Sequence, residues 1–89
     1  MWVITKDLID EGKNVGRGSA GLPEKPQCGK SHQLKYRFRL KDDDGEVYYE
    51  GYSSTNNDEE AFAPLDDFAE WYAGCTIIEY YVDKKWEVL

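Results

Sequence analysis

Three glycines near the start of the chain stand at the spacing of a dinucleotide-binding loop. In "NVGRGSAG", Gly16, Gly18 and Gly21 match the pattern G-x-G-x-x-G. Such a loop holds a pyrophosphate only where a strand precedes the glycines and a helix begins among them. Leu22-Pro23 and a charged stretch follow these glycines instead. We therefore predict a glycine-rich loop that binds no cofactor.

Residues of metal-binding type are present, but their spacing does not favour a site. Cys28 and His32 lie in one segment, and with Cys75 they would offer zinc three ligands, whereas a structural site normally needs four. The acidic run "DDDGE" suggests calcium, but Leu40 and Gly51 would then occupy the first and last ligand positions. Neither of them carries a carboxylate, so we predict no metal site.

Catalytic residues are not indicated either. An enzyme needs a base, a nucleophile or a metal in a defined arrangement. His32 is the one histidine and falls in an irregular segment, while the carboxylates show no spacing that singles out a pair. We expect a protein that is not an enzyme, and an unrecognised enzyme is the last of three hypotheses.

The most unusual candidate surface is basic and aromatic. Basic residues alternate along residues 34–41, and tyrosines follow in the next segment. Basic side chains beside aromatic rings are what binders of single-stranded nucleic acid use. The structural alternative is a solvated face on which one arginine pairs with Glu50 and another stacks on a tyrosine. The residues of this candidate binding face are Lys35, Arg37, Arg39, Lys41, Tyr48 and Tyr52.

Net charge ranks the partners that such a face could bind. The chain holds 18 acidic and 11 basic residues, which give a formal net charge of −7. This charge favours solubility and repels nucleic acid at long range. The leading hypothesis is therefore a binding module for a protein partner, such as a modulator of a basic protein. Single-stranded nucleic acid is the alternative ligand, and we expect a monomer or a weak dimer.

The sequence also suggests a compartment. No apolar run reaches the ~18 residues that span a bilayer. Acidic residues interrupt the N-terminal "MWVITKDLID", where a signal peptide would be continuously apolar. We expect a cytoplasmic protein that makes no membrane contact. Cys28 and Cys75 are then expected to be free thiols, because disulfides are rare in that compartment.

The clearest element that would position the candidate face is a hairpin. Residues 34–41 and 46–54 each alternate between two faces, and an Asp-Gly turn signal lies between them. Glu50 lies opposite Arg39 if the turn has two residues, and opposite Arg37 if the loop has four. Both registers keep the apolar faces of the two strands together, so we leave the choice open.

Upstream of the hairpin, the pattern predicts a strand and then a loop. Residues 2–9 read as a strand, or as a strand that runs into a turn, with Trp2, Ile4 and Leu8 on one face. Residues 10–33 contain five glycines and two prolines but few large apolar side chains. We predict that this segment is a long flexible loop.

Downstream, the pattern predicts a short helix and two more strands. The segment "TNNDEEAFAP" reads as a polar connection whose last residue, Pro64, begins the helix. Gly74 is placed to end that helix in a left-handed conformation. Residues 75–82 form the next strand, with Glu79 facing outward. A three-residue turn then places Val82 opposite Trp86 in the last strand.

These elements predict one domain over residues 1–89. No helix links two strands in the way that parallel pairing requires. We expect the α+β or mainly β class: a small twisted antiparallel sheet, or a partly closed barrel, of about four or five strands with one short helix.

Four segments also resemble a known group of sequences. They are "WVIT", "DDDGEVYYEG", "PLDDF" and "AGCTIIEYY", which together span most of the chain outside the glycine-rich loop. They resemble segments of short uncharacterised bacterial proteins. No activity is established for that group, so the resemblance implies a bacterial setting and no site residues.

Overall fold

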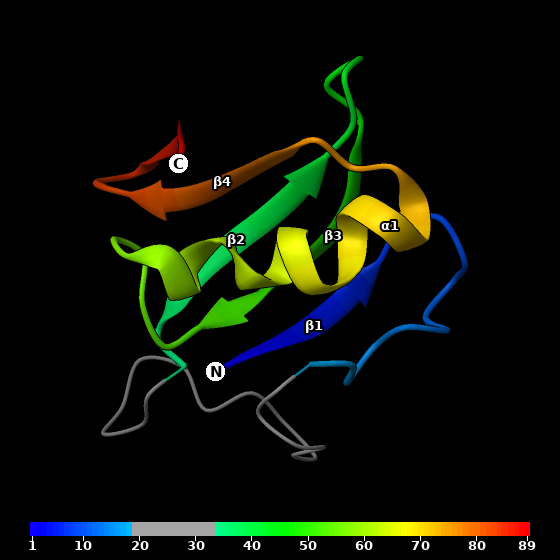
Figure 1. The fold of residues 1–89 in the computed structure, drawn as a ribbon, viewed down its shortest axis with the longest axis horizontal. Coiled ribbons are helices and arrows are strands. Elements are labelled where there is room, and N and C mark those ends of the chain that lie inside the picture. Colours follow the sequence, from blue (N-terminus) through cyan, green and yellow to red (C-terminus); the bar gives the residue numbers. More distant parts are fainter. Residues whose placement is uncertain (19–33) are drawn as a thin grey trace.

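The computed structural model describes residues 1–18 and 34–89 of the chain. Along the described chain, strands come before and after a run of short helical segments (Figure 1). The elements are β1 (Trp2–Asp7), β2 (Tyr36–Lys41), β3 (Val47–Ser53), η1 (Glu59–Phe62), η2 (Leu65–Ala69), α1 (Glu70–Ala73), β4 (Ile77–Val82) and β5 (Lys85–Val88).

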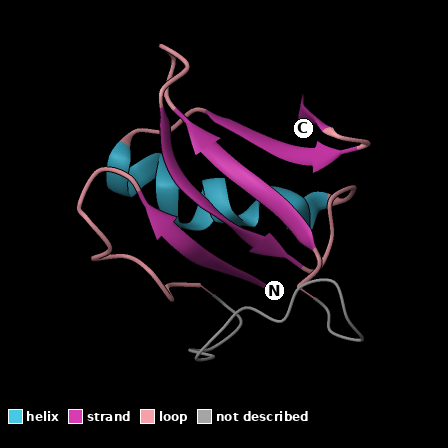
Figure 2. Cartoon of the chain, turned by 180° about the vertical axis from the view of Figure 1, so that it is seen from behind, coloured by secondary structure: helices cyan, strands magenta, loops and turns pink. Residues whose placement is uncertain are grey.

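The strands form one antiparallel sheet in the order β1-β3-β2-β4-β5. The segments η1, η2 and α1 run on from one another and lie across one face of this sheet, and we call them the helix layer. Figure 2 shows the opposite face, over which no described helix passes. The predicted antiparallel sheet with one helix is confirmed. The sheet is open, because β1 and β5 lie at its two edges and do not pair with each other.

The hairpin of β2 and β3 takes one of the two registers that the sequence left open. Arg39 lies opposite Glu50, and Leu40 lies opposite Tyr49. Nearer the turn the register shifts, so that Lys41 lies opposite Val47. Such a shift inserts an extra residue in one strand and interrupts the alternation of its side chains. The extra residue of β3 is Tyr48.

The core lies between the sheet and the helix layer. Phe38 and Leu40 of the central strand β2 are fully buried, as their alternation predicts. The Phe68 ring of the helix layer packs against the rings of Trp2 and Tyr49, with centroids 6.2 and 5.1 Å apart. Large aromatic rings supply much buried area for a chain of this length. The other buried members of this cluster are Ile4, Ala61, Leu65, Ala69, Cys75, Ile78 and Tyr80.

Strand β1 ends at Asp7 and runs into a turn, which is one of the two predicted alternatives, but Leu8 is exposed and does not share the buried face of Trp2 and Ile4. The cause is the carboxylate of Asp7, which accepts hydrogen bonds from the backbone N–H groups of Ile9 and Asp10 at 2.9 and 2.8 Å. The same carboxylate accepts from the Asn14 side chain at 2.6 Å. An aspartate that caps its own following residues turns the chain away from the strand direction.

The first part of the predicted loop lies along the outer edge of β1. The Gly16 N–H donates to the Ile4 carbonyl at 2.6 Å, and the Ile4 N–H donates to the Arg17 carbonyl at 2.7 Å. Gly18 forms an isolated bridge with Val3. Residues 10–18 therefore form no strand or helix but are attached to the sheet. The rest of the predicted loop, with Gly21, Cys28 and His32, lies outside the described residues.

The helix layer begins before the predicted start at Pro64. Asp58 is its first cap, since its carboxylate accepts from the Glu60 N–H at 2.9 Å. The prediction that this stretch is only a polar connection is wrong, because the cap starts a helical turn over Glu59–Phe62. Gly74 ends the layer with φ 76°, in the left-handed conformation that was predicted.

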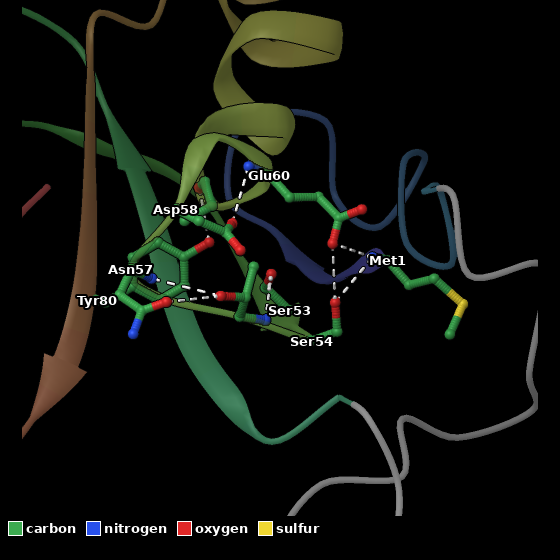
Figure 3. A network of polar contacts seen from close by, with 9 residues as sticks. Met1, Ser53, Ser54, Asn57, Asp58, Glu60 and Tyr80 are labelled. Carbon is green, nitrogen blue, oxygen red and sulfur yellow. Dashed lines mark hydrogen bonds and ion pairs between the residues drawn. The ribbon is translucent and has the colours of Figure 1, made fainter.

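Polar contacts fix the start of the helix layer to the sheet (Figure 3). The buried Tyr80 hydroxyl of β4 donates to the Ala61 carbonyl at 2.7 Å. The N-terminal ammonium of Met1 donates to the Ser54 hydroxyl at 2.9 Å and lies 3.4 Å from a Glu60 carboxylate oxygen. These contacts join the helix layer to β4 and to Met1, the residue that precedes β1.

The last hairpin has a different register from the one predicted. Tyr81 lies opposite Trp86, and Val82 lies opposite Lys85. The turn contains two residues rather than three, Asp83 and Lys84, with φ of 51° and 67°. Two consecutive left-handed residues form a tight turn whose backbone twist matches the right-handed twist of the flanking strands. This one-residue difference moves Trp86 to the outer face of the sheet.

Candidate functional site

The predicted face lies on the outer side of the sheet, where its basic residues meet carboxylates. The Arg37 guanidinium donates to Glu50 of β3 at 2.9 Å. This hydrogen bond raises the pKa of Arg37. The arrangement is the ion pair of the solvated-face alternative, although Arg37 lies diagonally across from Glu50 rather than directly opposite it.

A second carboxylate lies deeper in the same face. Glu79 of β4 bonds with the Arg39 guanidinium at 2.5 Å and with the Lys41 ammonium at 3.3 Å. Its side chain is only 9% exposed. Burial alone would raise the pKa of Glu79, but the hydrogen bonds and charges of Arg39 and Lys41 outweigh it and lower that pKa below the ordinary value of 4.5. Glu79 thus faces outward as predicted, yet it is buried there.

Aromatic rings of the last hairpin cover these arginines. The guanidinium carbon of Arg39 lies 4.2 Å from the centroid of the Trp86 ring, and that of Arg37 lies 5.2 Å from it. The Tyr81 ring packs edge-on against Trp86 at 5.2 Å. A planar guanidinium on an indole face is a favourable contact. Trp86 therefore holds both arginines in place over the sheet.

The remaining members of the candidate binding face differ in their positions. Lys35 is exposed just before β2, with its ammonium 5.8 Å from the Tyr36 ring centroid. Tyr52 is half-buried and lies in the same cross-strand row as Arg37. Tyr48 lies apart from the other members of this face. The register shift turns Tyr48 out of the alternation, so its side chain packs against the core cluster. A hydrogen bond with the Asp42 carboxylate raises the pKa of the Tyr48 hydroxyl.

Sequence reasoning missed Trp86 and Tyr81 as members of this face. For Trp86, the source of the error is the length of the last turn. Asp83-Lys84 contains no glycine, so the two-residue turn that fixes the register of Trp86 had no strong sequence signal. The alternation of Tyr81 with Tyr80 was the available signal for its outward position.

A second candidate surface lies on the other side of the molecule, on the helix layer. Trp71 is 67% exposed, yet its indole N–H donates to the Asp67 carbonyl at 2.7 Å. Tyr72 is 44% exposed and stacks on Phe68 at 5.2 Å. The exposed acidic residues of the layer are Glu59, Glu60, Asp66, Asp67 and Glu70. We call these acidic residues together with Trp71 the acidic helix face.

One basic residue borders the acidic helix face. The guanidinium carbon of Arg17 lies 4.8 Å from the Phe68 ring centroid and 5.3 Å from that of Tyr72. Its guanidinium also donates to the Asn14 side chain at 3.2 Å. Arg17 thus attaches the segment beside β1 to the helix layer, and it lies at the boundary of the acidic helix face.

Comparison of the chain with family models, curated proteins and solved structures found no match. The assignment of a function therefore rests on the surfaces described above. In the described parts of the chain, no helix is long and apolar enough to cross a membrane. In the same residues, no group of three or more potential ligands is arranged to hold a metal ion. Cys28 and His32, which the sequence suggested for zinc, are not among them.

The buried ionisable groups of the core are placed for packing. Cys75 is fully buried, and burial raises the pKa of its thiol to about 11. Burial likewise raises the pKa of Tyr80 to about 12. Tyr49 is also fully buried, and its hydroxyl has no hydrogen-bond partner within the described residues. At neutral pH these groups are uncharged and add no charge to either surface.

Proposed function

We propose that the chain is a small binding module that docks onto a protein partner through its acidic helix face, and that the partner carries a basic surface. Trp71 is the observation that supports this most. Its ring is exposed to solvent, but its indole hydrogen bond to the Asp67 carbonyl holds it in one orientation. Exposed tryptophans that are already ordered are common energetic centres of protein interfaces.

Charge supports a basic partner. Between Asp42 and Asp83 the sequence contains no lysine, arginine or histidine. The acidic residues around Trp71 are exposed, and none of Asp66, Asp67 and Glu70 forms an ion pair with the described residues. Unpaired surface charges of one sign attract and orient a partner of the opposite sign.

The outer face of the sheet is a weaker candidate for this role. Arg37, Arg39 and Lys41 already pair with Glu50 or Glu79. A partner would have to displace these carboxylates or bind around them, and breaking a half-buried pair leaves charges without compensation. The acidic helix face requires no such rearrangement.

The test compares matched variants on the two faces. Trp71→Ala and Tyr81→Ala each remove one exposed aromatic ring, from the helix layer and from the sheet respectively. Asp66→Asn with Asp67→Asn removes two charges from the helix layer, and Asp43→Asn with Asp44→Asn removes two charges from the β2–β3 turn. The wild type and each variant serve as bait in extract of the host, and each captured protein is purified and titrated against the wild type and all four variants by calorimetry.

The proposal predicts a basic partner whose affinity falls by about tenfold or more with Trp71→Ala and is unchanged with Tyr81→Ala. Loss of the helix charges should weaken binding and reduce its salt dependence, while loss of the turn charges should do neither. A partner that binds the helix variants as tightly as the wild type, or that itself is acidic, would refute the proposal.

Single-stranded nucleic acid stays a second candidate because of one observation on the sheet. Tyr81 is 43% exposed and lies beside the half-exposed guanidinium of Arg37. Base stacking on Tyr81 would leave the ion pairs beneath it intact. Titration of labelled oligonucleotides at low salt tests this ligand. Salt-sensitive binding that is lost in Tyr81→Ala would favour it over the protein partner.

A further inference from the structure

The strand β5 forms an edge of the sheet that is open to pairing. It pairs with β4 and, in the described residues, with no other strand (Figure 1). The opposite edge differs, because the segment with Gly16 and Arg17 bonds to the backbone of Ile4 in β1. Among the described residues the two edges are therefore not equivalent, and β5 is the edge strand whose outward-facing backbone groups have no hydrogen-bond partner there.

The pairing of β5 with β4 determines which of its backbone groups face outward. The Leu89 N–H donates to the Ile78 carbonyl at 3.1 Å. In an antiparallel pair, hydrogen-bonded residues alternate with residues whose N–H and C=O point away from the neighbouring strand. Trp86 and Val88 therefore direct these groups outward, to where a further strand would lie.

We infer that a second copy of this chain binds at this edge, with the two β5 strands antiparallel and the two sheets continuous across a two-fold axis. In this arrangement Trp86 lies opposite Trp86 of the second copy. Lys85 then lies opposite Glu87 of the second copy, and the symmetry repeats that pair. Such an isologous contact needs a surface that complements itself, and the alternating charges of β5 provide one.

The charges also select this register over its neighbours. Outward-facing groups must pair with outward-facing groups, so the alternatives shift one strand by two residues. A shift in one direction places Glu87 opposite its own symmetry copy, and a shift in the other direction does the same to Lys85. Like charges directly opposite each other in a sheet are destabilising. One register alone joins opposite charges at both positions.

The side chains concerned are free to make these contacts. Lys85 and Glu87 are exposed, and neither forms an ion pair within the described residues. Val88 is 67% exposed. A short, charged edge resists unspecific aggregation, and the same charges permit one defined partner strand. The contact area of two four-residue strands is small, so the dimer should dissociate on dilution.

A charge-swap experiment tests the dimer. Lys85→Glu and Glu87→Lys are prepared separately and together, and each protein is examined by analytical ultracentrifugation over a range of concentrations. Lys84→Glu is the matched control, because it makes the same charge change one residue away, at a position that would lie opposite the neutral Val88 of the second copy. Circular dichroism confirms that each variant is folded.

The expected result is a concentration-dependent dimer of the wild type that weakens by about tenfold or more in each single variant. The double variant should regain the wild-type affinity. An equimolar mixture of the two single variants should also dimerise, since each then offers the charge that the other lacks. Lys84→Glu should behave as the wild type does.

Three results would overturn the inference. One is a wild type that stays monomeric at millimolar concentration. Another is a single variant that dimerises as the wild type does. The third is a mixture of single variants that fails to associate although both are folded. None of these depends on the acidic helix face, so the proposed function can fail while the dimer stands.

Discussion

The carboxylate of Glu79 is the most consequential single charge on the sheet. It is nearly buried and bonds with both Arg39 and Lys41. Glu79→Gln would leave these two half-buried cations without a counter-charge. We expect the free energy of unfolding to fall by about 1–3 kcal/mol in urea titrations at pH 7. Glu50→Gln, which removes a more exposed pair with Arg37, should cost below about 1 kcal/mol. Equal losses in both variants would contradict this argument.

The depressed pKa values of the two buried carboxylates, Asp7 and Glu79, predict the response to acid. The pKa of Glu79 lies below 4.5 for the reasons given above. Burial would raise the pKa of Asp7, but the backbone hydrogen bonds from Asp10 and Ile9 and those from Asn14 outweigh it and hold that pKa below 3.8. As pH falls, the unfolded chain therefore takes up protons before the folded one does.

The stabilisation that these two carboxylates provide should accordingly be complete above the ordinary carboxyl pKa values. It should be lost as pH falls through the pKa values that Asp7 and Glu79 have in the folded chain. Urea midpoints measured from neutral pH down to about pH 2.5 check this. Glu79→Gln should flatten part of the decrease, because that position no longer binds a proton on unfolding. An unchanged pH dependence in this variant would show that Glu79 makes no contribution.

Gly51 is required at its position because the neighbouring strands leave no room for a side chain there. It lies in β3 between Ile4 of β1 and Phe38 of β2, and a Cβ there would lie 2.8 Å from Phe38 Cζ and would also meet the Val3 carbonyl oxygen. Gly51→Ala should cost about 2–3 kcal/mol, since the backbone of a neighbouring strand cannot move aside easily. Gly12→Ala is the control. Its Cβ would meet nothing, so only the cost of its positive φ, about 1 kcal/mol, remains.

Among the elements, the hairpin of β4 and β5 makes the most distinctive prediction. Its register places Trp86 over Arg39 on the outer face rather than opposite Val82. Trp86→Ala should therefore cost about 1–2 kcal/mol, which is what a partly exposed stacked ring contributes. A loss of about 3–5 kcal/mol in thermal or urea unfolding would instead mean that this ring is part of the core.

The elements also show what a sequence can and cannot predict. The hairpin of β2 and β3 was predictable because alternation and an Asp-Gly signal agree. The last hairpin was not, because Asp83-Lys84 adopts a left-handed turn without glycine. The start of the helix layer was missed because its cap, Asp58, lies within a polar run. No local pattern signals the register shift that removes Tyr48 from the outer face, since it depends on pairing between two strands.

For the whole molecule, the strand order could not be predicted from local patterns. The sequence indicated an antiparallel sheet with one helix, but not that β1 pairs with β3 at an edge or that β2 is central. Alternation placed Arg37, Arg39 and Lys41 on the outer side of the sheet, but it could not show how much of their charge is compensated there. The carboxylates of Glu50 and Glu79, which come from neighbouring strands, neutralise it.

The pairing of β1 with β3 has a consequence for the time course of folding. Val3 lies opposite Tyr52, so this contact must close a far longer loop than the hairpins require. The two hairpins should form early, and β1 should dock after the transition state. Stopped-flow measurements on Ile4→Val should then show faster unfolding, with a folding rate within about twofold of the wild type. Phe38→Leu, in the central strand, should slow folding instead. If Ile4→Val slowed folding equally, β1 would belong to the folding nucleus, and the order in which the sheet assembles would begin at its edge.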